Sequence, residues 1–366
     1  MFRNSMKKIL LSATTFVAVI SLVLTGCGDD NNSDSASSAD KPSIVVTTNI
    51  LGDVVTNMVG DSFNVEVIMP PGSDPHDFQA SAQQVQKMME ADLLIVNGAN
   101  FEEGMLDVIE NAESDGVMIF EAISVVSQLE GSDDHGDHGG HDDHDDHEGH
   151  DDHDEEGHDD HDEEGHDDHD EEKDHHDEEG HDDHEGHDHG GIDPHFFTDP
   201  ARMAVVAEGL SEFLVANFPD VDGFTSTAND YVQQLRDLDA DVEEILSVIG
   251  NNERALVTNH AVFAYFADRY SFTVLGEIIP SSSTLASASA QQLTSLAEEI
   301  KENNVKAIFA DASSSDALAQ TLAAEVEGVE VINLYTESLG DPGSSGESYI
   351  DMVRFNAQAI ASALVE

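Results

Sequence analysis

The sequence is short of cysteine, tryptophan and positive charge. Its 366 residues include one Cys, no Trp, and only 13 Lys and Arg against 78 Asp and Glu. The lone Cys excludes an internal disulfide and any cysteine-based zinc finger. The shortage of Lys and Arg argues against nucleic acid as a partner, because phosphate binding needs clustered positive charge. No Lys is followed by Ser or Thr, as a phosphate-binding loop requires, so the chain does not supply energy from a nucleotide by itself.

The negative charge and the histidines are concentrated in one segment. Residues 131–191 contain 17 of the 20 His and 31 of the 78 acids, with one base, Lys173, so this window carries −30 of the formal charge of −65. The octad His-Asp-Asp-His-Asp-Glu-Glu-Gly occupies 150–157 and again 158–165. Such a composition cannot bury a core, and we expect the window to be disordered.

The window has two interpretations. Imidazole suits zinc, copper and nickel, and carboxylates add charge attraction, so the window is expected to collect metal at many weak sites and pass it to a better one. The alternative is a solvated acidic spacer whose histidines spread by repeat expansion.

The first forty residues predict export and anchoring. Basic residues precede an apolar run over 9–24, which is shorter than the ~20 residues of a spanning helix and is typical of a secretory signal. The run ends in Leu24-Thr25-Gly26-Cys27, which resembles a bacterial lipobox; the alternative is an ordinary signal peptide with a chance Cys. We predict a signal peptide over 1–26, a lipid on Cys27 and a tether over 27–42. The protein would then lie on the extracytoplasmic face of the cell membrane, in the periplasm or at the cell surface.

The remaining chain alternates β-rich apolar runs with helical patterns, which predicts α/β lobes with parallel sheets. The predicted strands are 44–48, 65–68, 93–96, 117–120, 255–258, 272–275, 307–310 and 329–334. The predicted helices are 51–58, 81–89, 105–111, 201–216, 224–249, 262–270, 290–302, 316–326 and 349–364. We therefore predict two similar lobes, 43–221 (including the window) and 251–366, joined by a long rigid helix within 222–250. The alternative is that this helix belongs to the second lobe.

Only three histidines lie outside the window: His76, His195 and His260. His76 and His260 each follow a predicted strand, and His195 precedes a predicted helix. Ligands collect at such positions in open α/β sheets. One of them alone would more often be structural, but three of three at such junctions favour a binding site.

Six stretches around these histidines carry a specific resemblance. They are Pro-Gly-Ser-Asp-Pro-His-Asp-Phe (71–78), Ala-Asp-Leu-Leu-Ile-Val-Asn-Gly (91–98) with Phe101-Glu102, Asp-Pro-His-Phe-Phe-Thr-Asp-Pro (193–200), Asn-His-Ala-Val-Phe-Ala-Tyr-Phe-Ala-Asp-Arg-Tyr (259–270), Leu-Tyr-Thr-Glu-Ser-Leu-Gly (334–340) and Tyr-Ile-Asp-Met-Val-Arg-Phe-Asn (349–356). From about Ser43 to its end the chain resembles the zinc- and manganese-binding solute receptors of bacterial ABC importers, the zinc type in particular. A His-rich loop before the second metal histidine is also common in that branch.

The resemblance implies a metal site in the cleft between the lobes. Its ligands would be His76 and His195 from the first lobe, His260 from the second, and Glu337 as the carboxylate. Many members have Asp at the fourth position, so the longer Glu337 could reach differently or leave its place to a water. The alternative is that Glu337 is a surface glutamate that caps the loop and binds no metal. Asp311, at the end of a predicted strand, is a weaker rival ligand.

Three imidazoles and one carboxylate suit tetrahedral zinc, whereas manganese prefers more oxygen ligands. The manganese branch commonly has an acid where this chain has His260, so we expect Zn²⁺ as the transported ligand and Mn²⁺ as the lesser alternative. The implied partners are an ABC permease and its ATPase subunit, with the receptor a monomer held at the membrane by its N-terminal lipid. Two other functions stay open: a surface zinc buffer or adhesin, and, more remotely, an extracellular zinc hydrolase, for which His-Glu-x-x-His is missing.

Overall fold

The computed structural model describes residues 41–131 and 191–365. The predicted signal peptide, Cys27, the tether up to residue 40 and almost all of the acidic histidine window lie outside the described residues. The described residues from Lys41 onward form one compact unit. Within its described part, no helix is both long and apolar enough to cross a bilayer.

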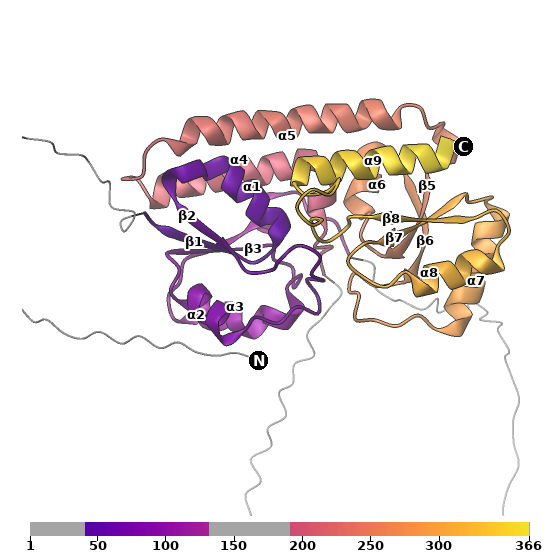
Figure 1. The fold of residues 1–366 in the computed structure, drawn as a ribbon, viewed down its shortest axis with the longest axis horizontal. Coiled ribbons are helices and arrows are strands. Elements are labelled where there is room, and N and C mark those ends of the chain that lie inside the picture. The colour runs from indigo at the N-terminus through magenta and orange to yellow at the C-terminus, as the bar shows by residue number, and fades with distance from the viewer. Residues whose placement is uncertain (1–40, 132–190, 366) are drawn as a thin grey trace, which may run out of the picture. The chain divides into compact units, whose positions relative to one another are not determined.

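Two four-stranded sheets form the frame, and the strands in each run parallel (Figure 1). The first sheet has the order β2-β1-β3-β4 and consists of β1 (Ser43–Val46), β2 (Asn64–Val67), β3 (Leu93–Val96) and β4 (Ile119–Glu121). The second has the order β6-β5-β7-β8 and consists of β5 (Ala255–His260), β6 (Thr273–Ile279), β7 (Ala307–Asp311) and β8 (Glu330–Leu334). The predicted two-lobed α/β fold with parallel sheets is confirmed.

Helices cover both faces of each sheet. They are α1 (Asn49–Val59), α2 (Ala82–Met89), α3 (Leu106–Ser114), α4 (Pro200–Asn217), α5 (Phe224–Leu246), α6 (Ala264–Tyr270), α7 (Ala290–Glu302), α8 (Ala317–Glu325) and α9 (Tyr349–Val365). Alternate strand residues point to opposite faces. Ile44 and Val46 therefore join the core with α1 and α4, whereas Val45 packs with α2 and α3. In the second sheet Phe309 faces the α9 side and Ile308 the α7 and α8 side.

Local sequence fixes where several helices begin. Thr48 caps α1 by accepting a hydrogen bond from the Leu51 N–H, and Ser81 forms a capping box with Gln84 at α2. Asp199 caps α4, whose first residue is Pro200.

The long helix α5 packs against α1 and α4 of the first lobe and against α9 at the end of the chain (Figure 1). Its apolar residues belong to a core cluster that includes strand residues of both sheets. The α-helix ends at Leu246, three residues before the predicted end, because the Ser247 and Ile249 N–H groups bond to carbonyls three residues back instead of four. The Arg254 guanidinium donates to the carbonyl oxygens of Leu246 and Ile249 beyond this point. The division at 43–221, 222–250 and 251–366 stays a prediction.

The core of α5 gives a stability prediction. Leu235 is fully buried, so Leu235→Ala should lower the free energy of unfolding by about 2–5 kcal/mol through lost burial and a cavity. Val215→Ala, at a half-exposed position of α4, is the control and should change it by no more than about 0.5 kcal/mol. Denaturant titration of the metal-free protein measures both. Equal losses of stability in the two variants would contradict the placement of Leu235 of α5 in the core.

Candidate metal centre

The three histidines outside the window and Glu337 come from four separate segments. His76 lies in the loop after β2, His195 just before the short 3-10 helix η4 (Phe196–Thr198), and His260 is the last residue of β5. Glu337 follows the end of β8. Parallel strands bring their carboxyl ends to one edge of a sheet, which is why residues so distant in sequence can meet there.

Two of the histidines are each the last residue of an Asp-Pro-His tripeptide, which occurs twice. In both copies the backbone N–H of the histidine donates to Oδ1 of the aspartate two residues earlier, Asp74 for His76 and Asp193 for His195, at 2.9 Å. The intervening proline restricts the backbone further. Each tripeptide is thus a rigid turn that fixes the direction of its imidazole.

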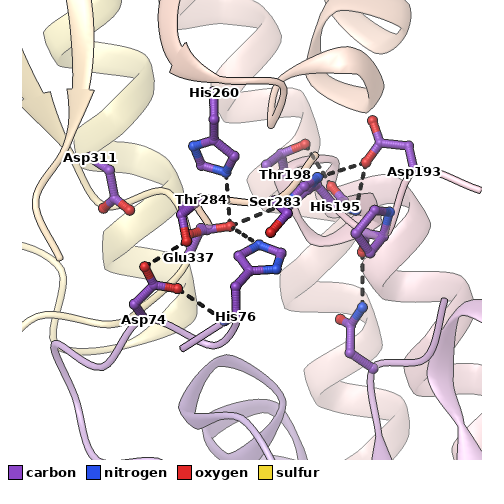
Figure 2. Close-up of polar contacts among 12 residues, drawn as sticks. Asp74, His76, Asp193, His195, Thr198, His260, Ser283, Thr284, Asp311 and Glu337 are labelled. Atoms are coloured by element: carbon purple, nitrogen blue, oxygen red, sulfur yellow. Dashed lines mark hydrogen bonds and ion pairs between the residues drawn. The ribbon is translucent and has the colours of Figure 1, made fainter. Parts of the chain in front are cut away.

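The four side chains meet at one point (Figure 2). Glu337 Oε1 lies 2.8 Å from His76 Nε2, 3.2 Å from His195 Nε2 and 2.9 Å from His260 Nε2. One ligand atom from each residue can be chosen so that all four lie within 4.8 Å of one another. All four residues are at most 2% exposed. The structure therefore brings together the four residues that the resemblance implies as ligands.

Second partners orient two of the rings. His76 Nδ1 lies 2.9 Å from Glu103 Oε1, and His195 Nδ1 lies 2.7 Å from Asp193 Oδ1. A carboxylate that accepts the Nδ1–H leaves the Nε2 lone pair for a cation and makes it more basic. Among the described residues, His260 Nδ1 and Glu337 Oε2 are buried without a hydrogen-bond partner.

The charges of the cluster are strongly coupled. Burial alone lowers the pKa of His76, but the charge of Glu337 and the hydrogen bond to Glu103 outweigh it and raise the pKa to about 10. Burial likewise lowers the pKa of His195, but Asp193 and Glu337 together outweigh burial, so the pKa is raised overall. Burial raises the pKa of Glu337, yet the charges of His260 and His76 hold it well below its usual range. A metal ion at this point would take the place of imidazole protons as the countercharge of Glu337.

This donor set fits a tetrahedral cation. Zinc is bound by imidazole nitrogen at ~2.0–2.1 Å and by carboxylate oxygen at ~2.0–2.2 Å, usually with four ligands.

Asp311, the rival ligand, is not part of the four-residue group. Its carboxylate accepts hydrogen bonds from the N–H and Oγ of Ser313, and burial together with the charge of Glu337 raises its pKa to about 6.

Sequence reasoning missed the two partner carboxylates. The repeated Asp-Pro-His tripeptide was an available signal for Asp193. Glu103 lies 27 residues from His76, and no local pattern links the two. Glu102, which carries part of the resemblance, is a structural residue: its carboxylate accepts hydrogen bonds from Thr47 Oγ1 at 2.6 Å and the Asn97 N–H at 2.7 Å. It ties the ends of β1 and β3 together.

The two ends of the histidine window meet next to His195. Glu130 and Ile192 form an antiparallel bridge, and the Asp193 N–H donates to the Leu129 carbonyl at 2.9 Å. Tyr265 of α6 donates to the Asp193 carbonyl at 2.8 Å and accepts from the Leu129 N–H at 3.0 Å. The stem of the window is therefore attached to the second lobe and, through Asp193, to a candidate ligand.

Residues 44–363 match the family described as zinc-uptake complex component A, periplasmic (ZnuA). The chain belongs to this family. It is 24% identical to the manganese ABC transporter substrate-binding lipoprotein PsaA of Streptococcus anginosus, over 98% of this chain and 99% of that protein. It is also 24% identical to the manganese-binding lipoprotein MntA of Halalkalibacterium halodurans, over 98% of this chain and 99% of that protein.

A relative of this ZnuA-family chain is named for zinc: AdcA of Streptococcus pneumoniae, a zinc-binding lipoprotein, is 28% identical over 97% of this chain and 60% of its own length. Among solved structures, the periplasmic zinc-binding protein TroA of Treponema pallidum matches with a TM-score of 0.68 and 24% identity, over 89% of this chain and 100% of TroA. This likeness confirms the fold. The relatives' names include both metals and do not choose between them.

The structural role of Glu102 can be tested. Glu102→Ala should lower the free energy of unfolding of the metal-free protein by about 1–3 kcal/mol, because it leaves the buried Asn97 N–H without its hydrogen-bond partner and removes the bond from the Thr47 hydroxyl. Glu110→Ala, at an exposed position of α3, is the control. Thermal and denaturant unfolding measure the change. A variant as stable as the wild-type protein would show that Glu102 does not tie the strands.

Proposed function

We propose that this protein is the extracytoplasmic receptor of an ABC importer, which captures Zn²⁺ and delivers it to a membrane permease driven by a separate ATPase subunit. The observation that carries the proposal is the meeting of His76, His195, His260 and Glu337 at one buried point. Membership of the ZnuA family supports the same function.

Zinc is favoured over manganese by the chemistry of the donors. Three imidazoles and one carboxylate make a nitrogen-rich, four-ligand set, whereas manganese is better served by carboxylate, carbonyl and water oxygens. Two of the imidazoles are made more basic by Glu103 and Asp193. The manganese receptor remains the alternative within the family, since relatives named for manganese align over nearly the whole chain.

The site suits capture and release more than catalysis. A catalytic zinc keeps an open position for water or substrate, but here Glu337 supplies a fourth ligand and all four residues are buried. Because the four residues are buried, we expect the loops that carry them to move when an ion enters, as in a receptor that closes around its cargo. A zinc hydrolase is accordingly disfavoured, while a zinc buffer or adhesin would use the same site without a permease.

The N-terminal lipid and the histidine window would complete the receptor. A lipid on Cys27 would hold a monomeric receptor at the membrane, and the acidic histidine window would gather metal loosely beside the stem at Leu129 and Asp193. Genes for a permease and an ATPase beside this one would favour import over buffering.

Metal titration tests the proposal. His76→Ala, His195→Ala and His260→Ala should each lower the tight zinc affinity at least about tenfold, since each removes a direct ligand. Competition with a chelator of known affinity measures the change. A wild-type affinity in all three variants would overturn the proposed site, and a clear preference for Mn²⁺ in the unaltered protein would assign the chain to the manganese receptors.

The window can be removed without disturbing its stem. Deleting residues 132–190 joins Gly131 to Gly191, which leaves a two-glycine turn between Glu130 and Ile192, residues that already pair antiparallel. The shortened protein should keep one tight zinc site and lose several weak ones in calorimetric titration. Loss of the tight site would place it in the window instead.

A further inference from the structure

The loop that carries Glu337 is buried, although it follows the last strand of the second lobe. Thr336, Glu337 and Ser338 are each 2% exposed. Buried backbone groups need hydrogen-bond partners, and the partners of this loop come from other segments. The identity of those partners determines which part of the molecule holds the carboxylate in place.

Asn49, the first residue of α1 in the first lobe, binds this loop through both ends of its side-chain amide. Asn49 Oδ1 accepts a hydrogen bond from the Leu339 N–H at 2.7 Å, and Asn49 Nδ2 donates to Ser338 Oγ at 2.9 Å. Asn49 is 6% exposed. The two bonds lie one and two residues after Glu337.

The same amide also reaches the loop of His76. Asn49 Nδ2 donates to the Pro70 carbonyl at 3.0 Å. The Gly72 N–H, in turn, donates to Ser338 Oγ at 2.8 Å and lies 3.1 Å from the Leu339 carbonyl oxygen. One asparagine thus connects the loops that carry two of the candidate ligands, one from each lobe.

A second asparagine holds the other side of the loop. Asn356 of α9 accepts from the Tyr335 N–H at 3.0 Å and donates to the Tyr335 carbonyl at 2.7 Å. The start of α9 is itself attached to the first lobe, because the Tyr349 N–H donates to Asp53 of α1 and the Tyr349 hydroxyl to the Phe197 carbonyl. The Glu337 loop is therefore held by Asn49 on one side and by Asn356 on the other. Asn49 belongs to the first lobe, and Asn356 is connected to it through the start of α9.

We infer that Asn49 is a positioning residue for metal binding: it fastens the Glu337 loop to the first lobe and so sets where Glu337 Oε1 stands against the imidazoles of His76 and His195. Three of the four ligands are then held by first-lobe contacts, and His260 is the one ligand built into the second sheet. The inference rests on the proposed function, because it concerns the affinity of the same site. Asn49 acts through Glu337 and is not itself a ligand.

A double-mutant cycle in the full mature chain tests the inference. Zn²⁺ affinity is measured by competition with a tight chelator, so that weak sites do not contribute. Asn49→Ala should lower the affinity about tenfold, the usual size of an effect transmitted through a ligand's supporting residue. In a Glu337→Gln background the same substitution should cost less than about twofold, because contacting residues that act as a unit are not additive.

Two further variants separate positioning from folding. Ser338→Ala removes one of the bonds from Asn49 and one from Gly72 while leaving the Leu339 contact, and it should show a smaller loss with the same dependence on Glu337. Asn217→Ala, where an exposed asparagine amide donates to the Phe213 carbonyl in α4, is the matched control and should bind zinc like the wild-type protein. Thermal unfolding of each metal-free variant reports on the fold.

The outcomes are distinct. A loss that disappears in the Glu337→Gln background supports the positioning role. An unchanged affinity in Asn49→Ala, or an equal loss in both backgrounds, overturns it. If His76→Ala also leaves the affinity unchanged, the proposed metal site itself is wrong; if His76→Ala lowers it and Asn49→Ala does not, only the positioning role is wrong.

Discussion

Three imidazole nitrogens meet one carboxylate oxygen in a space closed to solvent, and the rest of the structure depends on this interaction. A carboxylate as buried as Glu337 is costly unless it is paired and hydrogen-bonded. Here the Nε2 atoms of His76, His195 and His260 lie within 3.2 Å of the same oxygen, Oε1. The same arrangement of donors that stabilises the carboxylate in this state is a ready set of ligands for a divalent cation, which would bind all four groups at once.

The scaffold explains how such a cluster can be assembled from distant parts of the chain. Two parallel sheets present their strand ends to the same region, and α5 packs with elements of both lobes. Asp-Pro-His turns direct two rings, and Glu103 and Asp193 hold them by Nδ1. The Glu337 loop, although it follows β8, is bound by Asn49 of α1. By its place in the sequence this loop belongs to the second lobe, but its hydrogen bonds attach it to the first.

Much of this could be predicted from sequence, because it depends on local patterns. The alternation of apolar strands and amphipathic helices predicted all eight strands and all nine α-helices of the described residues, with shifts of a few residues at their ends. The three histidines were visible because each stands at a strand or helix junction. Glu103 and Asn49 could not be found in this way: their partners are 27 and 290 residues away, and such contacts are set by tertiary packing. The end of α5 was also predicted three residues too late, because the apolar spacing continues to Ile249 whereas the backbone turns after Leu246.

X-ray absorption at the zinc edge, on protein lacking residues 132–190 and loaded with one equivalent of Zn²⁺, tests the central claim most directly. The account predicts a first shell of four nitrogen and oxygen atoms at ~2.0–2.1 Å, with outer-shell scattering from three imidazoles. Replacing His260 by Ala should reduce that scattering to two imidazoles. A six-coordinate oxygen shell, or fewer than three imidazoles in the unaltered site, would contradict the account.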